Sequence, residues 1–453
     1  MSRKQIHTDC IIIGAGYAGI AAASRLHEAG KNIIVLEARE RIGGRVNTHV
    51  LPDSGVTVDL GAQWIGPGQH NMWNWVKKHQ VEVFDCYDSG KNIFDYRGNI
   101  SAYKGTIPKM NPIALIEIGI AMARLNKMCR QIPLESPWTA PKAQEWDSIT
   151  MDTWIRRNVK TGQARMAIHV GLETVFACQA SEISLLHFLF YCHSGDNLDT
   201  LLGVTGGAQQ TLFKKGTQHL LEQEAKPFRD KIYFNQPVKS IHQDDTGVIV
   251  YTDELEVIAK KIIIAIPPAL CQKIHFIQPL PQRKAQLFQR MPMGAAMKCF
   301  AVYEKPFWRE NNFSGQIVSD RTPFHASFDC SKPDDKGIFL FFVEGRHARD
   351  FIELPQHIRK EKVLSELEHY YGAQARKAID YTDKCWTEEE YSGGCYAGNF
   401  TPGSWTQFGQ VLRTPVGNIH WAGTETAVKW CGYMDGAIES GYRAADEILK
   451  SRL

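Results

Sequence analysis

The hydrophobic pattern near the N-terminus predicts a strand, a glycine turn, a helix and a second strand. The apolar run from Ile11 to Ile13 is β-branched, as is typical of strands. Segment 17–29 is rich in alanine and has apolar residues near helical spacing, and Gly30 follows it as a stop signal. A second apolar run spans 33–36. This order is that of a βαβ unit, the building block of α/β proteins.

Beyond this unit, the pattern separates a helical stretch from a strand-rich one. Segments 113–129 and 185–192 have the spacing of helices, whereas 298–308 and 337–345 have the composition of strands. The remaining elements are a β-hairpin with a return strand, predicted from 231–241 and 260–270, and a strand, glycine turn and helix, predicted from 416–449.

The glycines of the first turn predict a dinucleotide site. Gly14 permits the tight bend of a G-x-G-x-x-G turn, Gly16 lets the backbone approach a pyrophosphate, and Gly19 lets helix and strand pack closely. Free N–H groups at the start of the helix would face the phosphate charge. Glu37, at the end of the second strand, can accept hydrogen bonds from a ribose. An acid at this position argues against NADP.

Composition and charge narrow the class of protein. The 453 residues are 43% hydrophobic, enough to bury a large core. The net charge of +3 is small and the basic doublets never lengthen into a run, so no nucleic acid partner is expected. The eleven cysteines contain no C-x-x-C pair, so neither a disulfide framework nor a metal site is expected. No signal peptide or membrane-length apolar stretch is visible, which predicts a cytoplasmic protein without a membrane partner.

The residues after the second strand favour FAD over NAD. In "EARERIGGRV" (37–46), a glycine pair precedes Arg45, and an arginine there can reach a diphosphate while the glycines let the backbone come close. A basic surface loop is the alternative. The stretch, which includes Arg39 and Gly44, resembles the second glycine motif of FAD enzymes such as amine oxidases and glutathione reductase relatives. FAD is therefore the expected cofactor.

Longer motifs resemble one family. The stretch "VDLGAQWIG" (58–66) is similar to the segment beside the isoalloxazine ring in flavin-dependent amine oxidases. The stretch from "CWTEEEYSGGCYAGNF" (385–400) to the last predicted helix resembles monoamine oxidases almost motif for motif. On this resemblance the chain is identified as a member of the flavin-containing monoamine oxidases, of the soluble bacterial type.

The resemblance implies an α/β fold with two domains. An FAD-binding, Rossmann-like domain of the glutathione-reductase and amine-oxidase type would be joined to an α+β substrate domain with a mixed sheet and helices. The expected FAD-binding segments are 1–80, 210–290 and 391–453, and the expected substrate-binding segments are 81–209 and 291–390. The oligomeric state is left open, with a homodimer as one option.

The resemblance also implies where FAD lies. Cys395 matches the cysteine that forms a thioether with the flavin 8α carbon, although some relatives hold FAD without a bond and a free thiol is the alternative. Val238 would contact adenine, the Met434 backbone the pyrimidine edge, and Glu425 the ribityl or phosphate side. The expected cofactor-binding residues are Gly14, Gly16, Gly19, Glu37, Arg39, Gly44, Arg45, Gly61, Ala62, Gln63, Trp64, Val238, Trp386, Cys395, Glu425 and Met434.

Three residues are expected to carry the chemistry. Oxidation of an amine moves a hydride equivalent to flavin N5, which requires a neutral amine beside the ring and little water. Tyr396 and Tyr433 match the family's two tyrosines whose faces flank the amine, with core packing as the alternative. Lys298 matches the lysine that hydrogen-bonds a water at N5 and assists reoxidation by O2; otherwise it would face solvent from an edge strand.

The expected function is oxidative deamination of primary aryl or alkyl amines to an imine and aldehyde, with release of ammonia and reduction of O2 to H2O2. Alternatives with the same fold are polyamine or putrescine, L-amino-acid and N-heterocyclic amine oxidases. A non-catalytic binding protein with a Rab-escort-like fold is an alternative of another class. In the substrate cavity, Ala208 stands where animal enzymes have glutamine and Gln209 follows it, so either could face the substrate.

Overall fold

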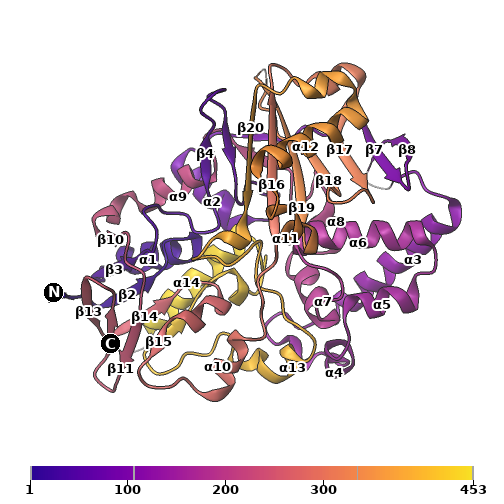
Figure 1. The fold of residues 1–453 in the computed structure, drawn as a ribbon. Coiled ribbons are helices and arrows are strands. Elements are labelled where there is room, and N and C mark those ends of the chain that lie inside the picture. Colours follow the sequence, from indigo (N-terminus) through magenta and orange to yellow (C-terminus); the bar gives the residue numbers. More distant parts are fainter. Residues whose placement is uncertain (1–2, 106–107, 334, 451–453) are drawn as a thin grey trace.

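The computed structural model describes residues 3–105, 108–333 and 335–450, which form three large sheets with helices around them (Figure 1). The first sheet is parallel and contains the predicted βαβ unit, so that prediction is confirmed. Its strands, in spatial order, are β10 (Ile232–Tyr233), β3 (Ile33–Leu36), β2 (Cys10–Ile13), β14 (Lys261–Ile264) and β21 (Ile419–Trp421).

Both faces of this parallel sheet are covered, which explains why its strands are apolar throughout. One face, which includes Ile12, packs on helices α1 (Tyr17–Glu28) and α14 (Met434–Lys450). Ile11 points to the other face, which packs on the second sheet. The carboxyl ends of the parallel strands therefore form one edge between two covering layers, which is where such sheets bind ligands.

Helices α1 and α14 come from opposite ends of the chain and cross at close range. At the crossing, Gly441 of α14 faces the backbone of α1, and a Cβ at this glycine would lie only 2.2 Å from the carbonyl oxygen of Ala18. The absence of a side chain at Gly441 thus allows the two helix backbones to approach.

The second sheet is mixed, with two antiparallel and two parallel pairings, and has the order β1-β13-β12-β11-β15. Strands β11 and β12 form the predicted hairpin, and after β13 the chain returns to the first sheet as β14, so the hairpin and return strand are confirmed. The strands are β1 (Lys4–His7), β13 (Leu255–Ala259), β12 (Val248–Tyr251), β11 (Ser240–Gln243) and β15 (His275–Phe276).

The third sheet has seven strands of mixed direction, drawn from segments 91–103 and 296–385. Both segments belong to the expected substrate domain, although the domain division itself remains a prediction. Lys298 lies on β16, which pairs with β19 and β20, so the edge-strand alternative for this lysine is wrong. In spatial order the strands are β20 (Asp380–Cys385), β16 (Ala296–Tyr303), β19 (Gly337–Glu344), β18 (Ala326–Asp329), β17 (Phe313–Ser319), β7 (Lys91–Tyr96) and β8 (Asn99–Tyr103).

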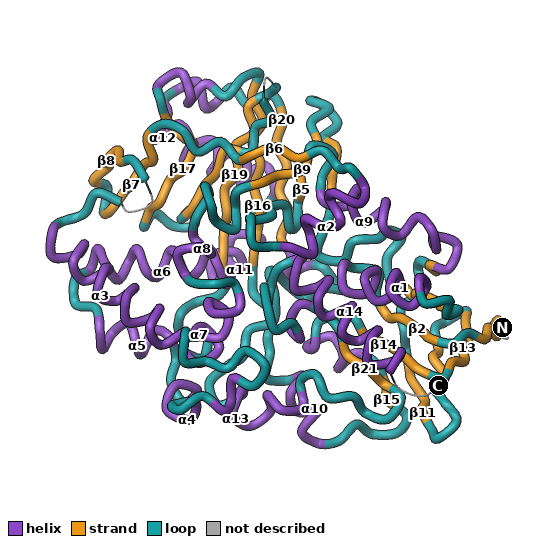
Figure 2. The backbone as a smooth tube through the Cα atoms, turned by 180° about the vertical axis from the view of Figure 1, so that it is seen from behind, coloured by secondary structure: helices purple, strands orange, loops and turns teal. Residues whose placement is uncertain are grey.

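Helices α3 and α5 to α8 gather beside this sheet (Figure 2). The predicted helices at 113–129 and 185–192 correspond to α3 and α7 and are confirmed. In the described part of the chain, no helix is both long and apolar enough to cross a membrane. The remaining elements are α2 (His70–His79), α3 (Pro112–Cys129), α4 (Ala143–Asp147), α5 (Met151–Asn158), α6 (Gly162–Phe176), α7 (Leu185–Ser194), α8 (Leu198–Leu202), α9 (Thr217–Ala225), α10 (Gln282–Phe288), α11 (Arg346–Ile352), α12 (Gln356–Tyr371), α13 (Ser404–Phe408) and the strand pairs β4 (Thr48–Val50) with β5 (Thr57–Asp59) and β6 (Val83–Asp85) with β9 (Thr211–Phe213).

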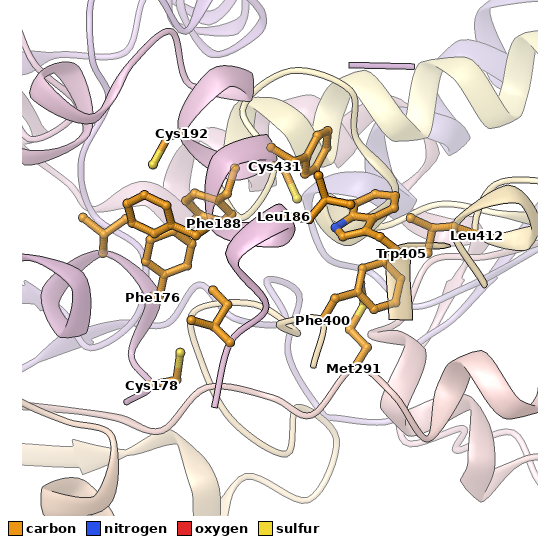
Figure 3. Close-up of a cluster of buried hydrophobic side chains, with 14 of the residues drawn as sticks. Phe176, Cys178, Leu186, Phe188, Cys192, Met291, Phe400, Trp405, Leu412 and Cys431 are labelled. Carbon is orange, nitrogen blue, oxygen red and sulfur yellow. The ribbon is translucent and has the colours of Figure 1, made fainter. Parts of the chain in front are cut away.

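An aromatic cluster joins the helical bundle to the C-terminal segments (Figure 3). Phe176, at the end of α6, packs on Phe188 of α7 with ring centroids 5.4 Å apart, and Phe400 packs on Trp405 at 4.7 Å. The Phe176 end of the cluster also supports the loop around residue 395, because Asn399 Nδ2 donates a hydrogen bond to Phe176 O. Burial of these large side chains fixes the position of that loop.

Candidate active site

A cavity of about 280 Å³ opens at the carboxyl edge of the parallel sheet. Its walls come from five parts of the chain: the first glycine turn, the segment 36–62, the middle segment around 238 and 265–274, the start of β16 at Ala296 and Lys298, and the segment 386–437. The expected site residues that line it are Gly14, Gly16, Glu37, Arg39, Gly44, Arg45, Gly61, Ala62, Val238, Lys298, Trp386, Cys395, Tyr396, Tyr433 and Met434. Expected residues outside the lining are Gly19, Gln63, Trp64, Ala208, Gln209 and Glu425.

The first glycine turn has the geometry that its sequence predicts. Gly14 adopts φ +98°, in the range that favours glycine. A Cβ on Gly19 would lie 1.8 Å from Gly14 O, so this glycine is needed for close packing of helix and strand. Gly16 is the N-cap of α1 and, among the described residues, receives no side-chain cap. The first N–H groups of α1 are therefore available to a phosphate at the cavity.

Glu37 is held in place by two backbone N–H groups. Its Oε2 accepts a hydrogen bond from Ala15 N at 2.8 Å, and its Oε1 accepts one from Arg39 N at 3.0 Å. A carboxylate has further acceptor capacity on each oxygen. Glu37 is buried at the cavity wall and can therefore also accept hydrogen bonds from a ribose diol.

Arg45 and Glu425 form a buried ion pair between segments 380 residues apart. Arg45 donates two hydrogen bonds to the carboxylate, at 2.6 and 3.1 Å, and a third to Tyr396 O at 2.8 Å. Burial raises the pKa of Glu425, but the charge and hydrogen bonds of Arg45 outweigh it and leave the pKa below its ordinary value. Glu425 thus lies behind Arg45 and orients it, and Arg45 is the residue that faces the cavity.

Lys298 is buried at the cavity wall, with only 4% of its surface exposed. Its Nζ donates to Asp59 O at 2.9 Å and to Gly61 O at 2.6 Å, and it also contacts Gln63 Oε1. An ammonium group has three hydrogens, so these three acceptors occupy all of them. Burial lowers the pKa of Lys298 to about 8. Lys298 therefore presents a titratable positive charge to the cavity.

Cys395, Tyr396 and Tyr433 line the same cavity as Lys298. Burial raises the pKa of Cys395 to about 12, although Arg45 and Lys298 act in the opposite direction. Burial also raises the pKa values of both tyrosines, so both rings are neutral. Tyr396 packs edge-on against Phe342, and Tyr433 packs against Tyr191 and Trp430.

Glu344 is a site residue that the sequence reasoning missed. It ends the apolar strand β19 and is 1% exposed, and its Oε1 accepts a hydrogen bond from the Tyr396 hydroxyl at 2.6 Å. Its Oε2 is buried and has no hydrogen-bond partner in the described part of the chain. Burial raises its pKa well above the ordinary value, which favours the protonated form of the carboxyl group. The available signal was a single acid at the end of the eight-residue run "GIFLFFVE".

Ala208 and Gln209 are packed into the turn that follows α8. Ala208 N donates to Thr200 O at 2.8 Å, and Gln209 Nε2 donates to Leu201 O at 3.0 Å. Both residues lie outside the cavity lining. Their assignment to the substrate cavity remains a prediction.

Comparison with known proteins now gives the family. The model of the flavin containing amine oxidoreductases matches residues 17–449. The chain belongs to this family. It is 37% identical to AofH of Mycobacterium tuberculosis, a candidate flavin-containing monoamine oxidase, over 97% of this chain and 96% of that protein. It follows that the chain is an oxidoreductase that acts on amines and uses a flavin.

Solved structures show the same fold. Putrescine oxidase bound to putrescine superposes with a TM-score of 0.94 at 29% identity, covering 98% of this chain and 100% of the other. Cyclohexylamine oxidase from Brevibacterium oxydans superposes with a TM-score of 0.93 at 30% identity, and the match covers 97% of this chain and 98% of the other. These matches confirm the expected fold class of an α/β flavin domain with a mixed-sheet α+β part.

The cavity suits the FAD expected for this family. Gly16 and Gly44 lie next to each other in its wall, and a Cβ on Gly44 would come within 3.5 Å of Gly16 Cα. A pyrophosphate can approach the backbone there and meet the N-terminus of α1. Glu37 would hold the ribose and Arg45 the diphosphate, as expected from their sequence positions.

Proposed function

We propose that the protein catalyses oxidative deamination of primary aryl or alkyl amines, with O2 as the electron acceptor. The observation that supports this proposal is that Lys298, the neighbours Cys395 and Tyr396, and Tyr433 come from three separate segments and line one cavity together with the residues expected to bind FAD. In the overall reaction, the amine, O2 and water give an aldehyde, ammonia and H2O2.

The chain's own residues prepare the amine. FAD, when bound, supplies the acceptor for the two electrons and the hydride equivalent. Tyr396 and Tyr433 would flank the amine with their aromatic faces and orient its nitrogen, and burial beside them would favour its uncharged form. The hydrogen bond from the Tyr396 hydroxyl to Glu344 fixes the orientation of that ring. The apolar surroundings exclude water, so the imine is hydrolysed only after release.

Lys298 would act on O2 through its charge. Its hydrogens are directed at Asp59 O, Gly61 O and Gln63, so we infer an electrostatic effect instead of a hydrogen bond to a water at flavin N5. O2 acquires negative charge as it is reduced, and a fixed cation in a low-dielectric site stabilises that charge.

Cys395 would hold FAD covalently through a thioether to its 8α carbon. Bond formation removes the thiol hydrogen and one methyl hydrogen together with two electrons, which O2 can accept to form H2O2. The positive charges of Arg45 and Lys298 favour the thiolate needed for this step. One solved structure of putrescine oxidase, from a redesign of its cofactor binding, carries a cysteine in place of an alanine.

We expect Cys395→Ala to convert covalent FAD into dissociable FAD. After acid precipitation, the wild-type pellet should keep the flavin absorbance and an intact mass heavier by one FAD, whereas the variant should release its flavin into the supernatant. Cys431→Ser is the matched control, because Cys431 is equally buried but lies outside the cavity lining. Release of all flavin from the wild-type protein would disprove the thioether, and the amine oxidase assignment would stand.

A diamine such as putrescine is the second candidate substrate, because Glu344 places an acid with a free oxygen beside the Tyr396 hydroxyl. We expect H2O2 production with benzylamine and hexylamine to exceed that with putrescine and L-leucine. Because Glu344 orients Tyr396 through one hydrogen bond, Glu344→Leu, which removes the acceptor, should lower kcat/KM for all amines by a similar factor of up to about ten, the value of one lost hydrogen bond between neutral groups. Loss confined to putrescine would make the diamine the substrate.

A further inference from the structure

A cluster of metal-binding side chains lies outside the flavin cavity. Glu173 of α6, His325 immediately before β18 and His347 of α11 each bring one ligand-type atom, and the three atoms lie within 4.8 Å of one another. The three residues come from separate elements of the bundle and the third sheet, so the fold itself holds them together. Two imidazoles and one carboxylate are a set that binds Zn²⁺ and related ions in proteins.

His325 is oriented as a metal ligand. Its Nδ1 lies 3.0 Å from Ser319 O, and because a carbonyl oxygen only accepts, Nδ1 must carry the hydrogen. The neutral ring therefore keeps a lone pair on Nε2. This nitrogen is buried and has no hydrogen-bond partner in the described part of the chain, while the whole residue is 6% exposed. Metal-binding histidines commonly donate their second ring N–H to a backbone carbonyl in this way.

The protonation states suit a ligand set. Burial lowers the pKa of His325, and burial together with His325 and Arg346 lowers the pKa of His347 to about 4, so both rings are neutral at pH 7. The two rings are 5.0 Å apart. Burial raises the pKa of Glu173 to about 7, against the effects of Gln179 and Arg346. A bound cation would displace the proton of Glu173.

The charges around the cluster do not oppose a cation overall. Arg346 is adjacent and its Nε donates a long hydrogen bond of 3.5 Å to His347 Nε2, which an ion at that nitrogen would replace, and its exposed charge is screened by solvent. Each of the three residues also has a nearby carboxylate whose negative charge would attract a cation. These carboxylates are Glu182 for Glu173, Asp320 for His325 and Asp350 for His347.

We propose that Glu173, His325 and His347 bind one divalent transition-metal ion of the Zn²⁺ class, with water completing the coordination. His347 is only partly buried, which gives the ion a path from solvent. The site would also lie close to the amine cage, since Glu173 acts electrostatically on Glu344, and Glu344 holds the Tyr396 hydroxyl. The proposal does not depend on which amine the enzyme oxidises.

The test is a metal titration of the untagged holoenzyme after treatment with a chelator. We expect Zn²⁺ to bind with one equivalent per chain and a micromolar or tighter Kd in calorimetry, and Co²⁺ to give visible d–d absorption. His325→Ala and His347→Ala should each weaken Zn²⁺ binding at least about tenfold. His357→Ala, which removes an exposed imidazole from α12, should leave the Kd unchanged.

Flavin absorbance and circular dichroism establish that each variant is folded. If His325→Ala does not fold, the proposal is tested with His347→Ala, which changes a partly exposed residue, and with Glu173→Gln, which is nearly isosteric. Millimolar binding to the wild-type protein, a Kd insensitive to the cluster variants, or an equal loss in His357→Ala would each overturn the proposal.

Discussion

Replacing Glu425 with alanine is expected to destabilise the protein by about 3–5 kcal/mol and to reduce its FAD content. The substitution leaves Arg45 buried without its carboxylate, and an uncompensated buried charge costs about this much. Gly398 N also loses its acceptor. The measurements are the melting temperature and the ratio of flavin to protein absorbance after purification.

Two further variants distinguish the effect of an unpaired buried charge from the general effect of losing an ion pair. Glu145→Ala removes one partner of an exposed pair with Lys142, and we expect a change within about 0.5 kcal/mol. The double variant Arg45→Met with Glu425→Leu removes both buried charges, so stability should largely return while FAD content stays low, because Arg45 faces the cavity. A loss below about 1 kcal/mol in Glu425→Ala would contradict a structural role for the pair.

Reoxidation of the reduced enzyme by O2 is expected to slow as the pH rises through about 8. Burial lowers the pKa of Lys298 to this value, so the side chain is a cation below it and neutral above it. Its titratable neighbours change protonation elsewhere: the pKa of Asp59 is raised to about 6 and that of Cys330 to about 12, mainly by burial, and Cys395 has no thiol once the thioether has formed. The inflection should therefore belong to Lys298.

Lys298→Met should reduce the reoxidation rate at pH 7 by about 10²-fold and remove the inflection, since one preorganised charge contributes roughly that factor. Stopped-flow mixing of anaerobically reduced enzyme with O2 measures the rate, and the reductive half-reaction should change much less. Lys284→Met is the matched control: Lys284 is equally buried, donates to Val411 O and Leu412 O, and lies outside the cavity. An unchanged pH profile in Lys298→Met would exclude the proposed role.

The parts of the site that the sequence predicted are those with a local cause. Gly14 and Gly19 could be predicted from the sequence because a tight turn requires the first glycine and a close helix–strand contact requires the second, five residues later. The chemistry of Glu37 follows from its place at a strand end. Each of these inferences uses spacing along one βαβ unit, where the backbone geometry is fixed by the sequence itself.

The parts that the sequence could not predict depend on contacts between distant segments. Arg45 binds Glu425, which lies 380 residues further along the chain. Tyr396 binds Glu344 of β19, and the position of β19 in its sheet cannot be predicted from hydrophobic periodicity. The hydrogen-bond acceptors of Lys298 could not be predicted for the same reason. A lysine in an apolar run indicates that the side chain is buried, but it does not indicate which groups accept its hydrogens. Likewise, the motif position of Ala208 says nothing of the packing that places it outside the cavity lining.

The crossing of α1 and α14 at Gly441 has a consequence for biosynthesis. The first glycine turn leaves the ribosome early, but Tyr433 and Met434, which complete the cavity, lie among the last twenty or so residues described. Chains are synthesised from the N-terminus at about 5–20 residues per second. The N-terminal βαβ unit is therefore present during most of translation without α14, the helix that covers it. We expect FAD capture to follow the synthesis of α14, and flavin supply from that point to govern the yield of folded enzyme.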